Sequence, residues 1–152
     1  MKYSLLLLCS TLSLTTTTKA IEPRWLDWIE AEESNHRPGA IGDNGKAIGL
    51  FQFHEAAWIQ TSEIRRKKGK ATYPYAYARN QSINRAYAVD WLEWHEQQLT
   101  KRLGRSPNIG ELFASHNLGL QGFANKAYLL NRTRKSTRTV AYRLILKDKL
   151  FK

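Results

Sequence analysis

Cysteine is almost absent from this sequence, because Cys9 is the only one among 152 residues. A single cysteine cannot close a disulfide within the chain, so burial of apolar side chains must stabilise the fold instead. Hydrophobic residues make up 42% of the chain and aromatic residues 11%, a composition typical of globular rather than disordered proteins. The length suits one domain with a single core.

The sequence also lacks an apolar run long enough to span a bilayer. Its apolar start is short: residues 5–8 are leucines that follow the basic Lys2, and a small-x-small motif ends at Ala20. This arrangement predicts a signal peptide over residues 1–20. It also predicts a mature domain over residues 21–152 that is secreted or periplasmic.

A retained N-terminal anchor and lipid attachment at Cys9 are the alternatives to a cleaved signal. The short apolar run disfavours an anchor. Lipid attachment is disfavoured because Leu8 stands where a small residue would be expected. On the favoured interpretation Cys9 leaves with the signal, and the mature domain has no cysteine and no stable membrane anchor.

Acidic residues are scarce, with 13 Asp and Glu against 24 Lys and Arg, and the net charge is +11. Loss of Lys2 and Lys19 with the signal would lower this charge by two, to +9. A strongly basic secreted domain suits an anionic polymer as its partner. Peptidoglycan, with its carboxylates, fits this expectation, and by charge alone nucleic acid fits equally well.

Pairs or triplets of ligands at metal-binding spacing are also missing, so we predict no metal site and no cofactor. His95 lies within a helical pattern and is expected to be a packed or surface histidine rather than a ligand.

Apolar residues recur at helical spacing along most of the mature chain, which predicts a mainly α-helical single domain. Gly104 and a capping box formed by Asn108 and Glu111 mark helix ends. Residues 35–46 are rich in turn-forming residues and are expected to form a loop. Residues 61–81 hold a basic run and are expected to be irregular. The expected helices are residues 23–34, 47–60, 82–103, 109–116 and 122–131, and a last helix from 136 or 137.

Gly49 falls inside the second expected helix, where glycine is costly. Two explanations stay open: close approach of a bound sugar to the backbone, and close packing of helices.

Two adjacent carboxylates end the first expected helix. Trp25, Trp28 and Ile29 recur at helical spacing, and Glu32 extends this series. Leu26 and Ile29 form a second series, which Glu33 extends. One of the two should therefore lie near the buried stripe. Desolvation and the negative end of the helix dipole both raise the pKa of a carboxyl there. Such a group can act as a general acid, whereas a Glu-Glu pair at a helix end is more often simply solvated.

Three short motifs follow one another along the chain: Glu33-Ser34, then Gly-Leu-Phe-Gln at 49–52, then Ser-His-Asn-Leu-Gly at 115–119. In this order they resemble the lytic transglycosylases of the lysozyme superfamily, which carry Glu-Ser, Gly-Leu-Met-Gln and Ala-Tyr-Asn-Ala-Gly. The Ala-Ile-Gly-Asp-Asn-Gly run before Gly49 is similar to a small secreted branch of that superfamily. The resemblance extends from Ile21 to about Tyr142.

The resemblance implies a lysozyme-like single domain with a cleft for a glycan strand. It implies cleavage of the β-1,4 bond between N-acetylmuramic acid and N-acetylglucosamine, with formation of a 1,6-anhydro sugar. Glu33 matches the family's essential carboxylate, which acts first as acid and then as base. This scheme needs no second carboxylate, unlike that of most glycosidases.

Other site residues are also carried over from the family. Ser34 matches a serine that orients the substrate or the glutamate, and Gln52 matches a glutamine that hydrogen-bonds near the catalytic centre. Asn117 matches the asparagine of the third motif. Tyr142 is aligned with a tyrosine of the C-terminal helix. All four are therefore expected to contact substrate or support the site.

Two positions depart from the family pattern. Phe51 replaces a methionine, which is a mild change. His116 replaces a tyrosine that lines the site, and because histidine charge depends on pH, activity is expected to be weaker or to have a different pH dependence.

Three other functions stay open on the sequence. A hydrolytic lysozyme would need a second carboxylate to activate water, and Asp43 is the first candidate. A non-catalytic wall-binding protein on the same fold is favoured weakly by His116 and disfavoured by the intact Glu33-Ser34. A nucleic-acid binder would leave the secretion signal and the polar motifs unexplained, so we expect no specific nucleic-acid partner.

Overall fold

The computed structural model describes residues 20–151. Cys9 and all of the predicted signal peptide except Ala20 lie outside the described residues. The described part forms a mainly α-helical single domain with five helices and a small two-stranded hairpin. The helices are α1 (Pro23–Ser34), α2 (Glu55–Lys67), α3 (Gln81–Leu103), α4 (Ile109–Ala124) and α5 (Lys135–Leu150). The hairpin pairs β1 (Ile41–Gly42) with β2 (Ala47–Ile48), and short 3-10 turns are η1 (Asp43–Gly45), η2 (Tyr75–Arg79) and η3 (Leu130–Arg132).

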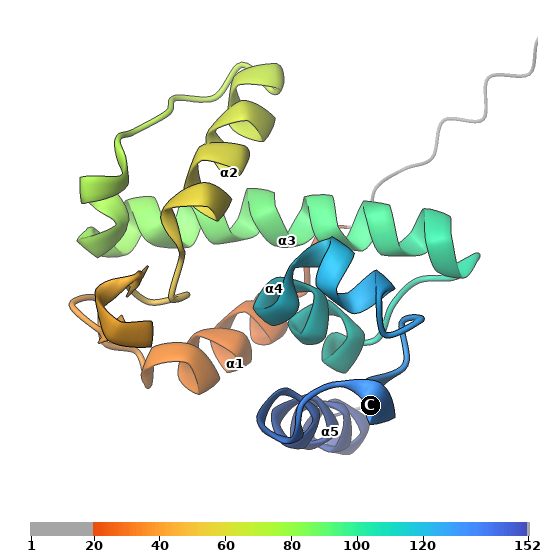
Figure 1. Ribbon diagram of the computed structural model, residues 1–152. Helices are drawn as coiled ribbons and strands as arrows, with labels where there is room; N and C mark the ends of the chain where they lie inside the picture. Colours follow the sequence, from red (N-terminus) through yellow and green to blue (C-terminus); the bar gives the residue numbers. More distant parts are fainter. Residues whose placement is uncertain (1–19, 152) are drawn as a thin grey trace, which may run out of the picture.

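The long helix α3 crosses the middle of the molecule (Figure 1). Helices α2 and α4 pack against it, and α5 packs against α4 at the edge of the domain. No helix within residues 20–151 is both long and apolar enough to cross a membrane.

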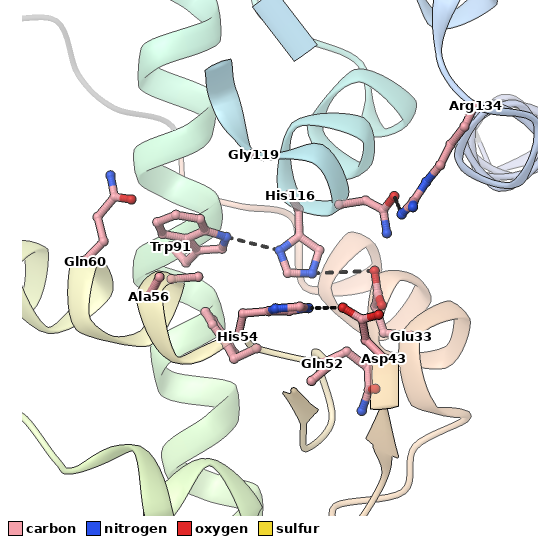
Figure 2. Close-up of a pocket in the computed structure, with 14 residues that line it drawn as sticks. Glu33, Asp43, Gln52, His54, Ala56, Gln60, Trp91, His116, Gly119 and Arg134 are labelled. Carbon is pink, nitrogen blue, oxygen red and sulfur yellow. Dashed lines mark hydrogen bonds and ion pairs between the residues drawn. The ribbon is translucent and has the colours of Figure 1, made fainter. Parts of the chain in front are cut away.

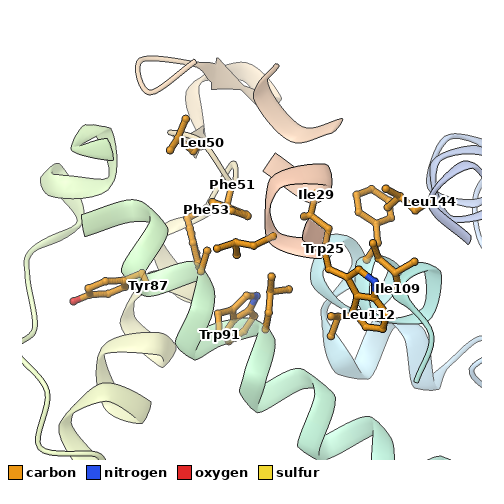
Figure 3. Close-up of a cluster of buried hydrophobic side chains, with 14 of the residues drawn as sticks. Trp25, Ile29, Leu50, Phe51, Phe53, Tyr87, Trp91, Ile109, Leu112 and Leu144 are labelled. Carbon is orange, nitrogen blue, oxygen red and sulfur yellow. The ribbon is translucent and has the colours of Figure 1, made fainter. Parts of the chain in front are cut away.

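The core brings together apolar side chains that are far apart in the sequence (Figure 3). Ile29 of α1, Phe51 of the turn after the hairpin, Tyr87 of α3 and Leu112 of α4 are all fully buried. Because the apolar stripe of α1 is buried here, the end of that helix is held against the centre of the domain.

Several expected elements are confirmed. Helix α1 has the expected bounds, and α3 ends at Gly104, which has the left-handed conformation that glycine tolerates. Asn108 and Glu111 form the expected capping box at the start of α4, with the side chain of each bonded to the other's backbone N–H.

The expected helix over residues 47–60 is wrong in its first half. Residues 47–48 form a strand, Ile48 then pairs with Phe53, and α2 begins only at Glu55. The backbone φ of Gln52 is 47°, which a helix does not permit. The apolar run was therefore that of a buried turn, which periodicity alone does not separate from a helix.

The expected irregular segment 61–81 is also wrong in part, because α2 continues to Lys67 through the basic run. Arg65, Lys68 and Lys70 all pair with the buried Asp90 of α3. This part of the basic run is thus an ion-pair cluster that attaches α2 to α3 rather than a solvated segment.

The helix expected over residues 122–131 is likewise wrong. Helix α4 ends at Ala124, and positive φ angles at Ala127 and Tyr128 turn the chain toward η3. The interruption expected near Gly119 is confirmed by its positive φ of 72° and its ψ of 157°, which are not helical and lie within α4. The last helix, α5, begins at Lys135, close to the expected start.

Gly49 occupies a position where the backbone leaves no room for a side chain. Its φ is 84°, and a Cβ there would lie 2.1 Å from the Ala78 carbonyl oxygen and 2.3 Å from Nδ2 of Asn84. The buried Asn84 accepts from the Phe51 N–H at 3.2 Å and donates to the Ala78 carbonyl at 2.7 Å. Close packing within the protein therefore accounts for this glycine. The atoms that crowd it belong to η2 and α3, so the contact is not one between two packed helices as expected.

The two hydrogen bonds by which Asn84 joins the Phe51 N–H to the Ala78 carbonyl are called the Asn84 clamp below. We predict that Gly49→Ala destabilises the protein by more than about 2 kcal/mol. The added methyl group would displace this clamp, and alanine would be strained at the φ of 84°. The matched control is Gly104→Ala, whose φ is 67° but which has nothing within 4 Å. It should show only the cost of the left-handed conformation, about 1 kcal/mol. Urea unfolding measures both, and equal losses would contradict the steric explanation.

Candidate active site

One cleft gathers most of the polar residues that the sequence motifs singled out (Figure 2). It has a volume of about 630 Å³, within the range of small-molecule and cofactor sites. The end of α1, the hairpin turn, the start of α2, α3, α4 and the residue before α5 form its walls. The lining residues are Glu33, Asp43, Ala47, Gln52, Phe53, His54, Ala56, Ala57, Gln60, Trp91, His116, Asn117, Gly119 and Arg134.

Glu33 is the least solvated carboxylate of this cleft. Its side chain is 12% exposed, and its Oε1 atom is buried without a hydrogen-bond partner. Burial raises the pKa of Glu33 to about 7, although the nearby charge of Arg134 and a hydrogen bond from Asn117 act to lower it. Its neighbour Glu32 instead forms an ion pair with Arg143 of α5. The structure therefore separates the two glutamates that the sequence left equivalent.

The amide of Asn117 is oriented by two donors. Arg134 donates to its Oδ1 at 2.9 Å, and the Thr137 hydroxyl donates to the same oxygen at 2.7 Å. With its oxygen engaged, the amide must present its NH₂ to other groups. That NH₂ is presented to Glu33 and acts to lower the pKa of its carboxyl.

The imidazole of His116 is held in one tautomer. Trp91 can only donate, and its indole N–H lies 3.1 Å from Nδ1, so Nδ1 is the acceptor and Nε2 carries the proton. Nε2 then donates to the Phe51 carbonyl at 3.2 Å and lies 3.6 Å from Oε1 of Glu33. The second distance is too long for a hydrogen bond in this state, so the N–H faces the carboxyl without binding it.

The expected pH-dependent charge of His116 requires a correction. Burial lowers the pKa of this histidine to about 4, and the electrostatic interaction with His54 acts in the same direction, whereas the bond to the Phe51 carbonyl opposes it. His116 is therefore neutral and a constant donor at neutral pH. His95 is packed, as expected: its ring bonds to Ser115 at 2.9 Å, and burial lowers its pKa to about 3.

Asp43 also lines the cleft, but in a different environment from Glu33. Its side chain is 60% exposed and pairs with Nε2 of His54 at 3.2 Å. Figure 2 shows this pair on the hairpin side of the cleft. The cleft thus holds one desolvated carboxyl and one solvated carboxylate.

Gln52 and Ser34 have contacts that stabilise the surrounding backbone. The Gln52 amide donates to the Gly49 carbonyl at 2.9 Å and to the Ala40 carbonyl at 3.3 Å, which leaves its oxygen as the remaining polar atom. Ser34 is buried and accepts from the Arg37 N–H at 3.3 Å, so it closes the end of α1. Gln52 lines the cleft, whereas Ser34 does not.

Tyr142 lies away from this site. It is on α5 with 44% of its surface exposed, and it does not line the cleft. The structure therefore does not place it with the other expected site residues, because Ala141 and Leu144 occupy the buried side of α5 at this level.

Sequence reasoning missed Trp91 and Arg134, which line the cleft, and Thr137, which supports it. The hydrogen bond from the Trp91 indole to His116 spans 25 positions of the sequence. Arg134 and Thr137 lie at the start of α5, where no local pattern marks them as partners of Asn117. Only tertiary packing brings these residues together.

Residues 20–151 contain no group of three or more His, Cys, Asp or Glu side chains positioned to hold a metal ion. The chemistry that the cleft offers is proton transfer by Glu33, with Asn117 and His116 as nearby neutral donors. Comparisons with family models, curated proteins and solved structures found no significant match.

We predict that Glu33→Gln stabilises the protein at alkaline pH. A carboxyl whose pKa rises from 4.5 to about 7 on folding binds more protons in the folded state, so the free energy of unfolding falls as pH rises through that interval. Glutamine escapes this loss. The variant should be more stable by on the order of 2 to 3 kcal/mol at about pH 8, with a smaller difference near about pH 4.

Urea unfolding at several pH values measures this difference. The control is Glu63→Gln, which removes a carboxylate that is 55% exposed on α2 and should have a small effect throughout. A Glu33→Gln variant whose advantage does not grow with pH would show that the carboxyl is not desolvated.

Proposed function

We propose that this protein is a peptidoglycan lytic transglycosylase with a lysozyme-like fold, secreted or periplasmic. The observation that carries the proposal is Glu33: a single desolvated carboxyl, with a pKa raised to about 7, in a cleft large enough for sugar rings. Two further features support it. The motifs that contain Glu33, Gln52 and Asn117 follow one another in the order that the resemblance implies, and all three residues line the same cleft.

In the first step, Glu33 donates its proton to the glycosidic oxygen. The bond between that oxygen and C1 of the muramyl sugar breaks, and its electron pair stays with the oxygen, which leaves as a hydroxyl. Positive charge develops at C1 and the ring oxygen, while Glu33 becomes a carboxylate. Burial suits this step because it keeps the carboxyl protonated until the substrate is bound.

In the second step, the C6 hydroxyl of the same sugar attacks C1 and transfers its proton to Glu33. The product is a 1,6-anhydro ring, Glu33 is protonated again, and no water is consumed. The Asn117 N–H and the Arg134 charge stabilise the intermediate carboxylate. His116 adds a neutral N–H 3.6 Å from Oε1, which would bond as the carboxylate forms.

A hydrolytic lysozyme is the second candidate, and the position of Asp43 favours it. Asp43 lines the same cleft and is exposed enough to hold a water molecule. In such an enzyme, Asp43 would take a proton from the water that attacks C1. The chemical form of the released sugar separates the two functions.

We predict that purified peptidoglycan treated with the protein releases fragments whose muramyl ends lack the mass of one water. Glu33→Gln should lower this release by about 10³-fold, because the proton donor is lost. Mass spectrometry of the fragments measures both. As this variant is expected to be at least as stable as the parent, its inactivity cannot be ascribed to unfolding.

Asp43→Asn is the discriminating control. Anhydro ends that persist at a similar rate in this variant support the transglycosylase. Hydrated ends that depend on Asp43 would establish the hydrolase instead. No cleavage by the parent protein would overturn both enzymatic assignments and favour a wall-binding role.

We predict that the cleavage activity has an upper pH limit set by the protonation of the Glu33 carboxyl. Because Glu33 must begin protonated, kcat/KM should fall about tenfold per pH unit above a pH of about 7.

The Arg134 charge lowers the pKa of Glu33, so Arg134→Gln should move this pH limit upward by about half a pH unit or more. Arg132→Gln, an exposed neighbour outside the cleft, is the control. An unchanged limit in Arg134→Gln would mean that another group controls the rate.

A further inference from the structure

Exposed apolar side chains gather on the C-terminal helix α5 and just after it. Within residues 20–151, nine large hydrophobic residues are exposed, and four of them lie between positions 142 and 151. Tyr142 is 44% exposed, Leu146 62%, Leu150 84% and Phe151 63%. Of the other five, Ile59, Tyr73 and Tyr77 form a smaller second group, and Ile41 and Leu129 belong to other segments. Contiguous exposed apolar surface marks interaction sites.

Three of these residues share one side of α5. Tyr142, Leu146 and Leu150 are spaced four positions apart, which places them in a row along the helix. Phe151 follows the last residue of α5, and its ring packs against Trp28 with 5.3 Å between the ring centres. The opposite side of α5 is buried through Ala141 and Leu144. The row is therefore not part of the core, and α5 carries apolar side chains on two faces.

Basic residues border the row on both sides. At 3.6 residues per turn, Arg138 and Lys149 lie along one side of it, and Arg143 and Lys147 along the other. All are exposed except Arg138, which is half-buried. Arg143 also pairs with Glu32, and Lys147 lies 4.7 Å from the Trp28 ring centre.

The exposed side of α5 carries no carboxylate of its own. No Asp or Glu occurs between Glu111 and Asp148. Asp148 itself is buried and accepts from the Trp25 indole at 2.8 Å. The exposed side of α5 therefore combines apolar and cationic groups without an acidic residue of its own.

We propose that this side of α5, formed by Tyr142, Leu146 and Leu150 with the bordering Arg138, Arg143, Lys147 and Lys149, docks reversibly on a membrane that contains anionic lipids. A helix with an apolar row between cations lies in the membrane interface, where the apolar side chains enter the acyl boundary and the cations meet lipid phosphates.

Other occupants match this surface less well. A hydrated anionic polymer would satisfy the cations but leave the apolar row in water. A symmetric pair of copies would bury the row but bring like charges together. An anionic lipid surface satisfies both features at once.

The proposed docking surface is separate from the cleft. Arg134, which lines the cleft, precedes the first residue of α5, and a helix of 16 residues is about 24 Å long. None of the residues of the docking surface lines the cleft. Membrane binding therefore does not depend on the proposed glycan cleavage.

The test is co-sedimentation of the full chain with vesicles of phosphatidylcholine, with and without 30% phosphatidylglycerol. We expect binding that requires the anionic lipid and weakens with salt. The double variant Leu146→Ser/Leu150→Ser should lower the partition coefficient by about tenfold or more. Lys149→Gln should lower it about fivefold, which corresponds to about 1 kcal/mol.

Two matched controls keep the test specific. Ile59→Ser removes an apolar residue that is 55% exposed on α2, and Lys101→Gln removes a cation from the last turn of α3. Neither should change vesicle binding by as much as twofold. Circular dichroism checks that every variant is folded.

Four results would overturn the proposal. They are absence of vesicle binding, equal binding to neutral vesicles, equal losses in variants and controls, and binding that survives the double leucine substitution. The last result would assign binding to another segment of the chain. A concentration-dependent dimer lost in the double variant would identify a second copy as the occupant instead.

Discussion

Desolvation of the Glu33 carboxyl is the constraint on which the candidate site depends. Helix α1 buries Ile29 in the core, and this packing carries the end of the helix into the cleft wall rather than into solvent. Burial alone would disfavour any ionised form, and a carboxyl that never ionises cannot act as a base. Asn117 and Arg134 offset part of that cost, so the pKa stays near neutrality and both protonation states are accessible.

The groups around this carboxyl are each fixed by another residue. Trp91 decides which nitrogen of His116 carries a proton, and Arg134 with Thr137 decides which end of Asn117 faces Glu33. The Asn117 amide already presents its NH₂ to the carboxyl, whereas the His116 N–H lies 3.6 Å from Oε1 and has to approach only slightly when charge develops. Such fixed dipoles in a poorly solvated cleft stabilise a changing charge more effectively than mobile water does. His116 thereby presents a neutral N–H toward the carboxyl without needing to be protonated.

The sequence predicts features whose causes are local. The extent of α1 follows from its periodicity, and the start of α4 follows from the Asn108 capping box. Features that depend on distant partners were not predictable. The apolar run from Ala47 has the pattern of a helix, yet the positive φ of Gln52 makes it a turn. The choice between Glu32 and Glu33 depends on Arg143, which lies 111 positions from Glu32 in the sequence. The neutrality of His116 likewise depends on burial, which its own motif does not reveal.

The Asn84 clamp has a consequence for which parts of the cleft can adapt. This buried side chain joins the Phe51 backbone to α3, so it ties the turn after the hairpin to the longest helix. At the opposite wall, the Arg134 bond to Asn117 is exposed, whereas the Thr137 bond to the same oxygen is partly buried. Exposed polar contacts open at low cost. The Arg134 side chain is therefore the part of the cleft wall that can yield most readily to an entering chain, while α5 itself stays packed on α4.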